Sequence, residues 1–189
     1  MFHRSLGAIG LALVALTRVS AQDSDVIRPE LQLSIGAFLP RGNMARDLRT
    51  AATVGAHARL ELMDFARGIV SVGWTPTSAT FLSGSNDEVH IWHYDAGIEL
   101  ISSREIGGGA TWRPLAGGGL GGRSYDYRAR GRETVTCATV YAALGSELQV
   151  GGIVYRLEGR GYLSGFPSPV TGHRELRNDF SLAFGLRRL

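Results

Sequence analysis

Arginine and glutamate recur at every second position in several parts of this chain. Arg156, Glu158 and Arg160 form one such set, and Arg59 and Glu61 form another. Alternate side chains of an extended strand point to the same face, so each set lies on one side of its strand. Carboxylates and guanidinium groups gathered in this way can form ion pairs, hold a charged ligand or line a narrow path for ions.

Other ionisable residues share the face that opposes the apolar side chains of their segments. The full set is Arg59, Glu61, His93, Asp95, Glu99, Arg113, Glu147, Arg156, Glu158, Arg160 and Arg187. Because an isolated buried charge is very costly, charges inside a protein must be paired. We therefore expect an interior charge network in which Glu61, Glu99, Glu147 and Glu158 pair with Arg59, Arg113, Arg156 and Arg160. A narrow conducting path or a ligand site is the functional alternative.

Histidine and serine are the other residues that could carry out chemistry. His90 and His93 lie near Asp95, but positions 90 and 93 point to opposite faces of a strand, and the sequence has no CxxC or HExxH. Lipid A deacylases, which are small barrels, carry His-x-Ser on one strand face, and neither His57 nor His90 has serine at that spacing. We expect no catalytic residues, no metal and no enzymatic activity.

A glycine-rich run, residues 117–122, contains the pattern GxGxxG. The dinucleotide-binding motif needs a strand before these glycines and a helix after them. The following residues, 123–127, have no helical period. We therefore expect no nucleotide and no other cofactor, and we interpret the glycines as positions of close packing.

These candidate residues lie in eight segments that alternate with a period of two, the pattern of a half-buried strand. In the last segment Phe180, Leu182, Phe184 and Leu186 alternate with small or polar residues. Pro114 should cause a bulge or another local irregularity in the fifth segment. The predicted strands are residues 30–40, 51–62, 66–75, 88–101, 110–123, 135–149, 153–165 and 177–188.

The connections between these strands run long, short, long, medium, long, short, long. Such alternation places the long connections at one end, as in outer-membrane barrels. A membrane chain without an apolar run of helix length has to cross as a closed barrel. The sequence predicts an all-β fold, an eight-stranded antiparallel up-and-down transmembrane β-barrel. An aromatic girdle is expected near the long connections, formed by Trp74, Trp92, Tyr94, Tyr125, Tyr127, Tyr162, Phe166 and Phe180.

The first residues have the features of a secretory signal peptide. His3 and Arg4 precede an apolar run at residues 6–16, and small residues occupy positions 19 and 21. We expect cleavage after Ala21, which leaves one barrel domain at residues 22–189. A short N-terminal anchor helix is the alternative.

The charge of the chain argues against nucleic acid as a partner. All basic residues are arginine, and without Arg4 and Arg18 the net charge of +3 falls to +1. So balanced a charge does not suggest nucleic-acid binding, and we expect no nucleic-acid partner. The single cysteine, Cys137, cannot form an intramolecular disulfide.

Over residues 22–189 the chain resembles the small bacterial outer-membrane β-barrels, the OmpA-like and OmpW-like proteins. The residues that carry the resemblance are the signal ending VSA at 19–21 and the segments LQLSIGAFLP at 31–40, PLAGGGLG at 114–121, YRLEGRGY at 155–162 and NDFSLAFGL at 178–186. The chain departs from that family at its end, where Arg187, Arg188 and Leu189 stand in place of a terminal aromatic residue. The resemblance implies an outer-membrane location in a Gram-negative cell envelope, reached through the signal peptide.

The expected function is a structural or surface-interaction role, with a charge-paired interior and exposed outer loops. A narrow porin-like pore for small solutes and a soluble periplasmic lipocalin-like binder are the alternatives. The expected partners are outer-membrane lipid, lipopolysaccharide and the barrel-insertion machinery, and the protein is expected to be a monomer.

Overall fold

The computed structural model describes residues 29–80, 87–127, 134–167 and 174–189. The predicted signal peptide, residues 1–21, lies outside the described residues, so cleavage after Ala21 stays a prediction. Within the described part of the chain, no helix is long and apolar enough to cross a bilayer.

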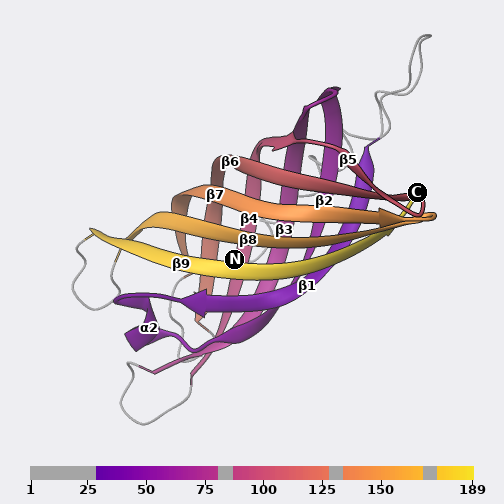
Figure 1. Ribbon diagram of the computed structural model, residues 1–189. Coiled ribbons are helices and arrows are strands. Elements are labelled where there is room, and N and C mark those ends of the chain that lie inside the picture. The colour runs from indigo at the N-terminus through magenta and orange to yellow at the C-terminus, as the bar shows by residue number, and fades with distance from the viewer. Residues whose placement is uncertain (1–28, 81–86, 128–133, 168–173) are drawn as a thin grey trace, which may run out of the picture.

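The described residues form one antiparallel sheet of nine strands that curls into a closed barrel (Figure 1). The strands are β1 (Glu30–Pro40), β2 (Ala51–Met63), β3 (Ala66–Ala79), β4 (Asp87–Ile101), β5 (Arg104–Gly107), β6 (Ala110–Tyr127), β7 (Val135–Val150), β8 (Ile153–Pro167) and β9 (Arg174–Arg188). Pairing between β1 and β9 and between β4 and β6 closes a ring of eight strands. The eight-stranded antiparallel barrel predicted from the sequence is therefore confirmed.

The two ends of the barrel differ. A short helix, α2 (Met44–Asp47), lies in the connection between β1 and β2, at the end reached by the last residues of β3. The hairpins β2–β3 and β7–β8 and the C-terminus lie at the opposite end (Figure 1). We call these the α2 end and the hairpin end. The strand β5, which the sequence did not predict, pairs with the first residues of β6 at the hairpin end.

The outer face of the barrel is apolar. On β1, Leu31 and Leu33 are 72% and 74% exposed, and Leu144 on β7 is 70% exposed. Along each strand the outward apolar residues alternate with inward ones. Gln32, which lies between Leu31 and Leu33 on β1, is buried. The alternation read from the sequence thus separates an apolar outside from a polar inside, the reverse of a soluble protein.

The predicted aromatic girdle is correct for one part of its residues and wrong for another. Trp92 and Tyr94 are 45% and 41% exposed on the outer face of β4. Tyr125, Tyr127 and Tyr162 are buried. The first two share the strand parity of Arg123, which points into the barrel, so they fill the interior instead of facing outward.

Pro114 causes no bulge between β6 and β7, where the register stays continuous from Ala110 to Tyr125. The β4–β6 pairing ends at Leu115, and the β5–β6 pairing begins at Trp112. Pro114 therefore lies where this edge of β6 changes partner, and a residue without an N–H is tolerated there. Its carbonyl accepts a hydrogen bond from the Ser102 N–H at 3.1 Å.

Glycines of β4 and β6 make room for a tyrosine inside the barrel. Gly97 and Gly119 are cross-strand partners, and the Tyr141 side chain lies over both. A Cβ added at Gly119 would lie 2.8 Å from Tyr141 Cε1 and 2.6 Å from Gly97 Cα. The GxGxxG run thus lies within a strand, where its glycines serve close packing.

A charge-filled interior as the candidate functional site

Six of the eight residues predicted to form the interior network are buried inside the barrel. They are Arg59, Glu99, Glu147, Arg156, Glu158 and Arg160, each at most 4% exposed. They come from β2, β4, β7 and β8, and all share the inward strand parity. The barrel geometry therefore concentrates them in one column along its axis.

Arg156 is the centre of this column. Its Nη1 donates to Glu147 Oε1 at 3.0 Å and to Glu99 Oε2 at 3.2 Å, and its Nε donates to Glu158 Oε2 at 2.8 Å. One guanidinium group thus contacts three buried carboxylates. Glu99 lies on β4, which is not a neighbour of β8 in the ring, so this contact crosses the barrel interior.

Two further arginines extend the column towards the hairpin end. Arg67 Nη1 lies 3.2 Å from Glu147 Oε2, so that Glu147 joins Arg67 to Arg156. Arg59 Nε lies 3.5 Å from Glu99 Oε2. Each of these carboxylates is therefore shared between two arginines, which balances charge where water is excluded.

Towards the α2 end the column continues through Arg160. This residue pairs with Glu158, and its Nη1 donates to Ser71 Oγ at 2.8 Å and lies 3.4 Å from Asp95 Oδ2. Tyr162 Oη donates to the same Asp95 oxygen at 3.0 Å. Serine and tyrosine hydroxyls thus supply hydrogen bonds that arginines alone would leave unmade.

An ion pair lies at each end of the column. Arg187 Nη1 lies 3.0 Å from Glu30 Oε1 at the hairpin end. At the other end Arg123 pairs with Asp179, and its guanidinium carbon lies 4.0 Å from the centroid of the Tyr162 ring. That distance is typical of a cation–π contact, so Arg123 joins the ionic column to the aromatic residues above it.

The other two predicted members lie outside the buried column. The Glu61 side chain is 68% exposed, although its Oε1 lies 3.2 Å from Arg67 Nη2. Arg113 is half-exposed, and its Nε donates to Ser103 Oγ at 3.3 Å. Both residues have the inward parity, but they lie too near the hairpin end to be enclosed.

Sequence reasoning missed Arg67, Arg123 and Asp179 as members, and it left Asp95 and Arg187 without partners. The signal was present in the strand parity. On β3, Arg67 has the same parity as Ser71 and the opposite parity to Val70 and Val72. On β9, Asp179 lies on the strand face opposite to Phe180 and Leu182. A count of every charge with inward parity would have included them.

A cluster of apolar side chains closes the interior at the α2 end. Met44 and Leu48, from α2 and the residue that follows it, are 0% and 2% exposed. They pack in a cluster with inward residues of β1, β3, β4, β6 and β7. The other members are Phe38, Ala79, Val89, Ile91, Tyr125, Tyr127 and Cys137. The expectation of a charge-paired interior therefore describes the middle and the hairpin end of the barrel but not this apolar layer.

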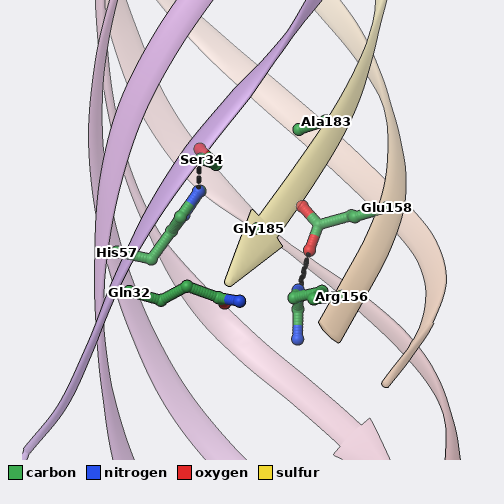
Figure 2. Close-up of a pocket in the computed structure, with 7 residues that line it drawn as sticks. All are labelled: Gln32, Ser34, His57, Arg156, Glu158, Ala183 and Gly185. Atoms are coloured by element: carbon green, nitrogen blue, oxygen red, sulfur yellow. Dashed lines mark hydrogen bonds and ion pairs between the residues drawn. The ribbon is translucent and has the colours of Figure 1, made fainter. Parts of the chain in front are cut away.

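A serine and a histidine meet inside the barrel beside the charge column. Figure 2 shows Ser34 Oγ and His57 Nε2, which lie 2.9 Å apart. Arg160 Nη2 lies 3.4 Å from His57 Nδ1, and because a guanidinium can only donate, this contact favours the tautomer with its proton on Nε2, facing Ser34. A general base for serine needs that nitrogen unprotonated and its other nitrogen held by an acid. This pair has the opposite arrangement.

The cavity in Figure 2 is small, and most of the residues that line it are polar or charged. It is lined by Gln32, Ser34, His57, Arg156, Glu158, Ala183 and Gly185, and its volume is about 10 Å³. A volume of that size holds about one water molecule. Among the residues that the structure describes, no group of three histidine, cysteine or acidic side chains could hold a metal ion.

Comparison with known proteins shows similarity in fold. No protein-family model and no curated protein sequence matches the chain. The structure is similar to Neisserial surface protein A, with a TM-score of 0.56 and 10% identity over 84% of this chain and 96% of that chain. A weaker match is Ail of Yersinia pestis, whose structure was solved in complex with the heparin analogue sucrose octasulfate. Its TM-score is 0.43 at 13% identity, over 85% of this chain and 97% of that chain. A major outer-membrane protein of Thermus thermophilus has a TM-score of 0.40, 10% identity, and coverage of 83% and 98%.

The closed ring, the apolar outside and the likeness to Neisserial surface protein A define the class of fold. It is the eight-stranded antiparallel β-barrel that outer-membrane proteins use. The narrower resemblance to the OmpA-like and OmpW-like proteins stays a prediction.

Proposed function

We propose that the protein is a sealed outer-membrane barrel whose role is structural or in surface interaction. The observation that carries the proposal is the interior, where the ionic column and the apolar layer fill the ring from the hairpin end to the α2 end. A ring of eight strands is just wide enough for side chains to fill. Its outer leucines suit lipid and would aggregate in water.

The two alternative functions predict interiors of another kind. A lipocalin-like binder needs an apolar cavity inside and a polar surface outside, and this barrel has the reverse pattern. A pore needs a continuous aqueous path, whereas Arg156 and its three carboxylates occupy the axis.

The pore alternative can be tested by conductance. We expect the full chain in planar bilayers to give no steady single-channel current, because the ionic column and the apolar layer both block the axis. Any current should be confined to rare, brief events. A stable open level in most insertions would contradict the sealed barrel and favour the narrow pore.

An arginine on the outer face tests the location. We expect Leu144→Arg to lower the free energy of unfolding in bilayers by about 2–4 kcal/mol, because residue 144 is 70% exposed in the middle of β7 and would face lipid. The matched control is Leu62→Arg near the hairpin end, where we expect about 0–1 kcal/mol. Urea titration followed by gel mobility measures both variants. Equal, negligible effects would favour the soluble alternative.

The proposal includes no enzymatic activity. Among the described residues, Ser34 and His57 are the serine and histidine that meet, and the contact from Arg160 favours the tautomer with the histidine proton on the side of the serine. A substrate would also need more room than a cavity of about 10 Å³ provides. Expression of the protein should therefore leave the acyl chains of the membrane lipids unchanged.

Lipopolysaccharide is the partner that we propose at the α2 end. Arg41, Arg46 and Arg49 are exposed in the connection that contains α2. The Arg41 guanidinium carbon lies 5.8 Å from the centroid of Phe180 on the outer face. Guanidinium groups beside an interfacial aromatic residue suit lipid phosphates.

We further propose that the chain is inserted by the barrel-insertion machinery and acts as a monomer.

A further inference from the structure

We propose that residues 41–50 form a latched lid that seals the α2 end of the barrel, with the ion pair between Asp47 and Arg177 as the latch. This inference rests on the proposed sealed barrel and deepens it. It assigns the seal at one mouth to a single segment and the closure of that segment to one electrostatic contact.

The underside of the lid is apolar and fits the mouth. Met44 and Leu48 are 0% and 2% exposed, and they pack against the inward residues of five strands. The upper side of the lid is polar and exposed, with Arg41, Arg46 and Arg49. A segment with one apolar face would lose this burial if it moved away, so packing favours the closed position.

The lid is joined to β3 mainly by backbone hydrogen bonds. Leu48 forms a β-bridge with Ala79, and the Arg49 N–H donates to the Ser78 carbonyl at 3.2 Å. The Thr80 N–H donates to the Asp47 carbonyl at 2.8 Å. These bonds form one firm edge, which acts as the hinge side.

On the opposite side, the lid contacts β9 through an ion pair and a backbone hydrogen bond. Arg177 Nη2 on β9 lies 2.8 Å from Asp47 Oδ2, and the Arg41 N–H donates to the Asn178 carbonyl at 3.3 Å. The Arg177 side chain is 4% exposed and that of Asp47 is 25% exposed, so the ion pair is partly shielded from water. Loss of the carboxylate would leave a buried guanidinium without that charge partner, which favours opening on this side.

The chain carries its own reporter of lid opening. Its single cysteine, Cys137, is 5% exposed and belongs to the apolar layer beneath the lid. A maleimide that is too polar to enter the closed layer should reach this thiol when the lid opens. The labelling rate of Cys137 therefore reports the population of the open lid.

The test is labelling of the full chain, folded in detergent micelles, with a charged maleimide. We expect wild-type Cys137 to react at least about 100-fold more slowly than in the urea-unfolded chain, and Asp47→Asn to react about tenfold faster than wild type. Glu61→Gln is the matched control, since Glu61 pairs with a buried arginine, Arg67, at the hairpin end. We expect the control to react at the wild-type rate.

A second variant keeps the test informative if Asp47→Asn fails to fold, which unboiled gel mobility would reveal. Leu48→Ser makes the underside of the lid polar and leaves the latch intact, and it should also accelerate labelling about tenfold. Wild-type rates in the folded latch or underside variants, or equal acceleration in Glu61→Gln, would overturn the lid. Rapid labelling of a wild-type chain that is silent in planar bilayers would overturn the lid alone and leave the sealed barrel standing.

Discussion

Replacement of Arg156 by methionine is expected to lower the free energy of unfolding by about 3–5 kcal/mol. The reason is that this one guanidinium group contacts Glu99, Glu147 and Glu158 in a part of the barrel that excludes water. Without it, three buried carboxylates each lose a cationic partner, and a buried carboxylate that lacks its partner is destabilising. Methionine keeps an unbranched apolar stem like the aliphatic part of arginine, so the effect reports the loss of the guanidinium group and its ion pairs.

The matched control is Arg113→Met, the same substitution in a residue that was predicted to join the network. Arg113 is half-exposed, and the structure shows a hydrogen bond from its Nε to Ser103. We expect a change below about 0.5 kcal/mol. Urea titrations of both variants in the same lipid, followed by tryptophan fluorescence and gel mobility, measure the difference. Equal effects would show that the column does not depend on Arg156.

A methyl group at position 119 is expected to cost about 1–3 kcal/mol, despite being the smallest possible addition. The Cβ of Gly119→Ala would lie 2.6 Å from Gly97 Cα and closer still to the Ala96 carbonyl oxygen. Both obstacles are backbone atoms of β4, so strands β4 and β6 would have to separate at the point where their pairing closes the ring.

The control for this variant is Gly161→Ala on β8, where an added Cβ would meet no atom within 4 Å. We expect the stability of that variant to equal or slightly exceed that of wild type, since alanine restricts the unfolded chain. Equilibrium unfolding in urea compares the two. A Gly119→Ala barrel as stable as Gly161→Ala would mean that the approach of β4 to β6 is looser than the structure shows.

Strand positions were predictable because lipid and a packed interior impose opposite polarities on alternate residues. The prediction for β1 has the same bounds as the observed strand, and β2 and β7 differ by one residue at one end. Strands β3, β6 and β8 run further towards the α2 end than predicted, through Ala79, Tyr127 and Pro167. Their terminal residues are polar or break the apolar alternation, so the pattern that identifies a strand in lipid fades there.

The parity of each strand predicted which charges point inward, but it could not predict their partners. The contact of Arg156 with Glu99 depends on how far β8 and β4 are staggered around the ring, which no single strand encodes. The apolar layer was harder to predict. Tyr125 and Tyr127 suit an interface and an interior equally well, and the connection that carries Met44 and Leu48 has no strand period.

Gel mobility of the detergent-extracted protein tests the central claim of a closed membrane barrel most directly. The protein should require detergent for extraction, and the unboiled sample should migrate differently from the boiled one, because a closed barrel resists unfolding by the gel detergent at room temperature. A chain that stays in solution without detergent and migrates identically before and after boiling would contradict the account. That result would make a soluble periplasmic binder the leading interpretation.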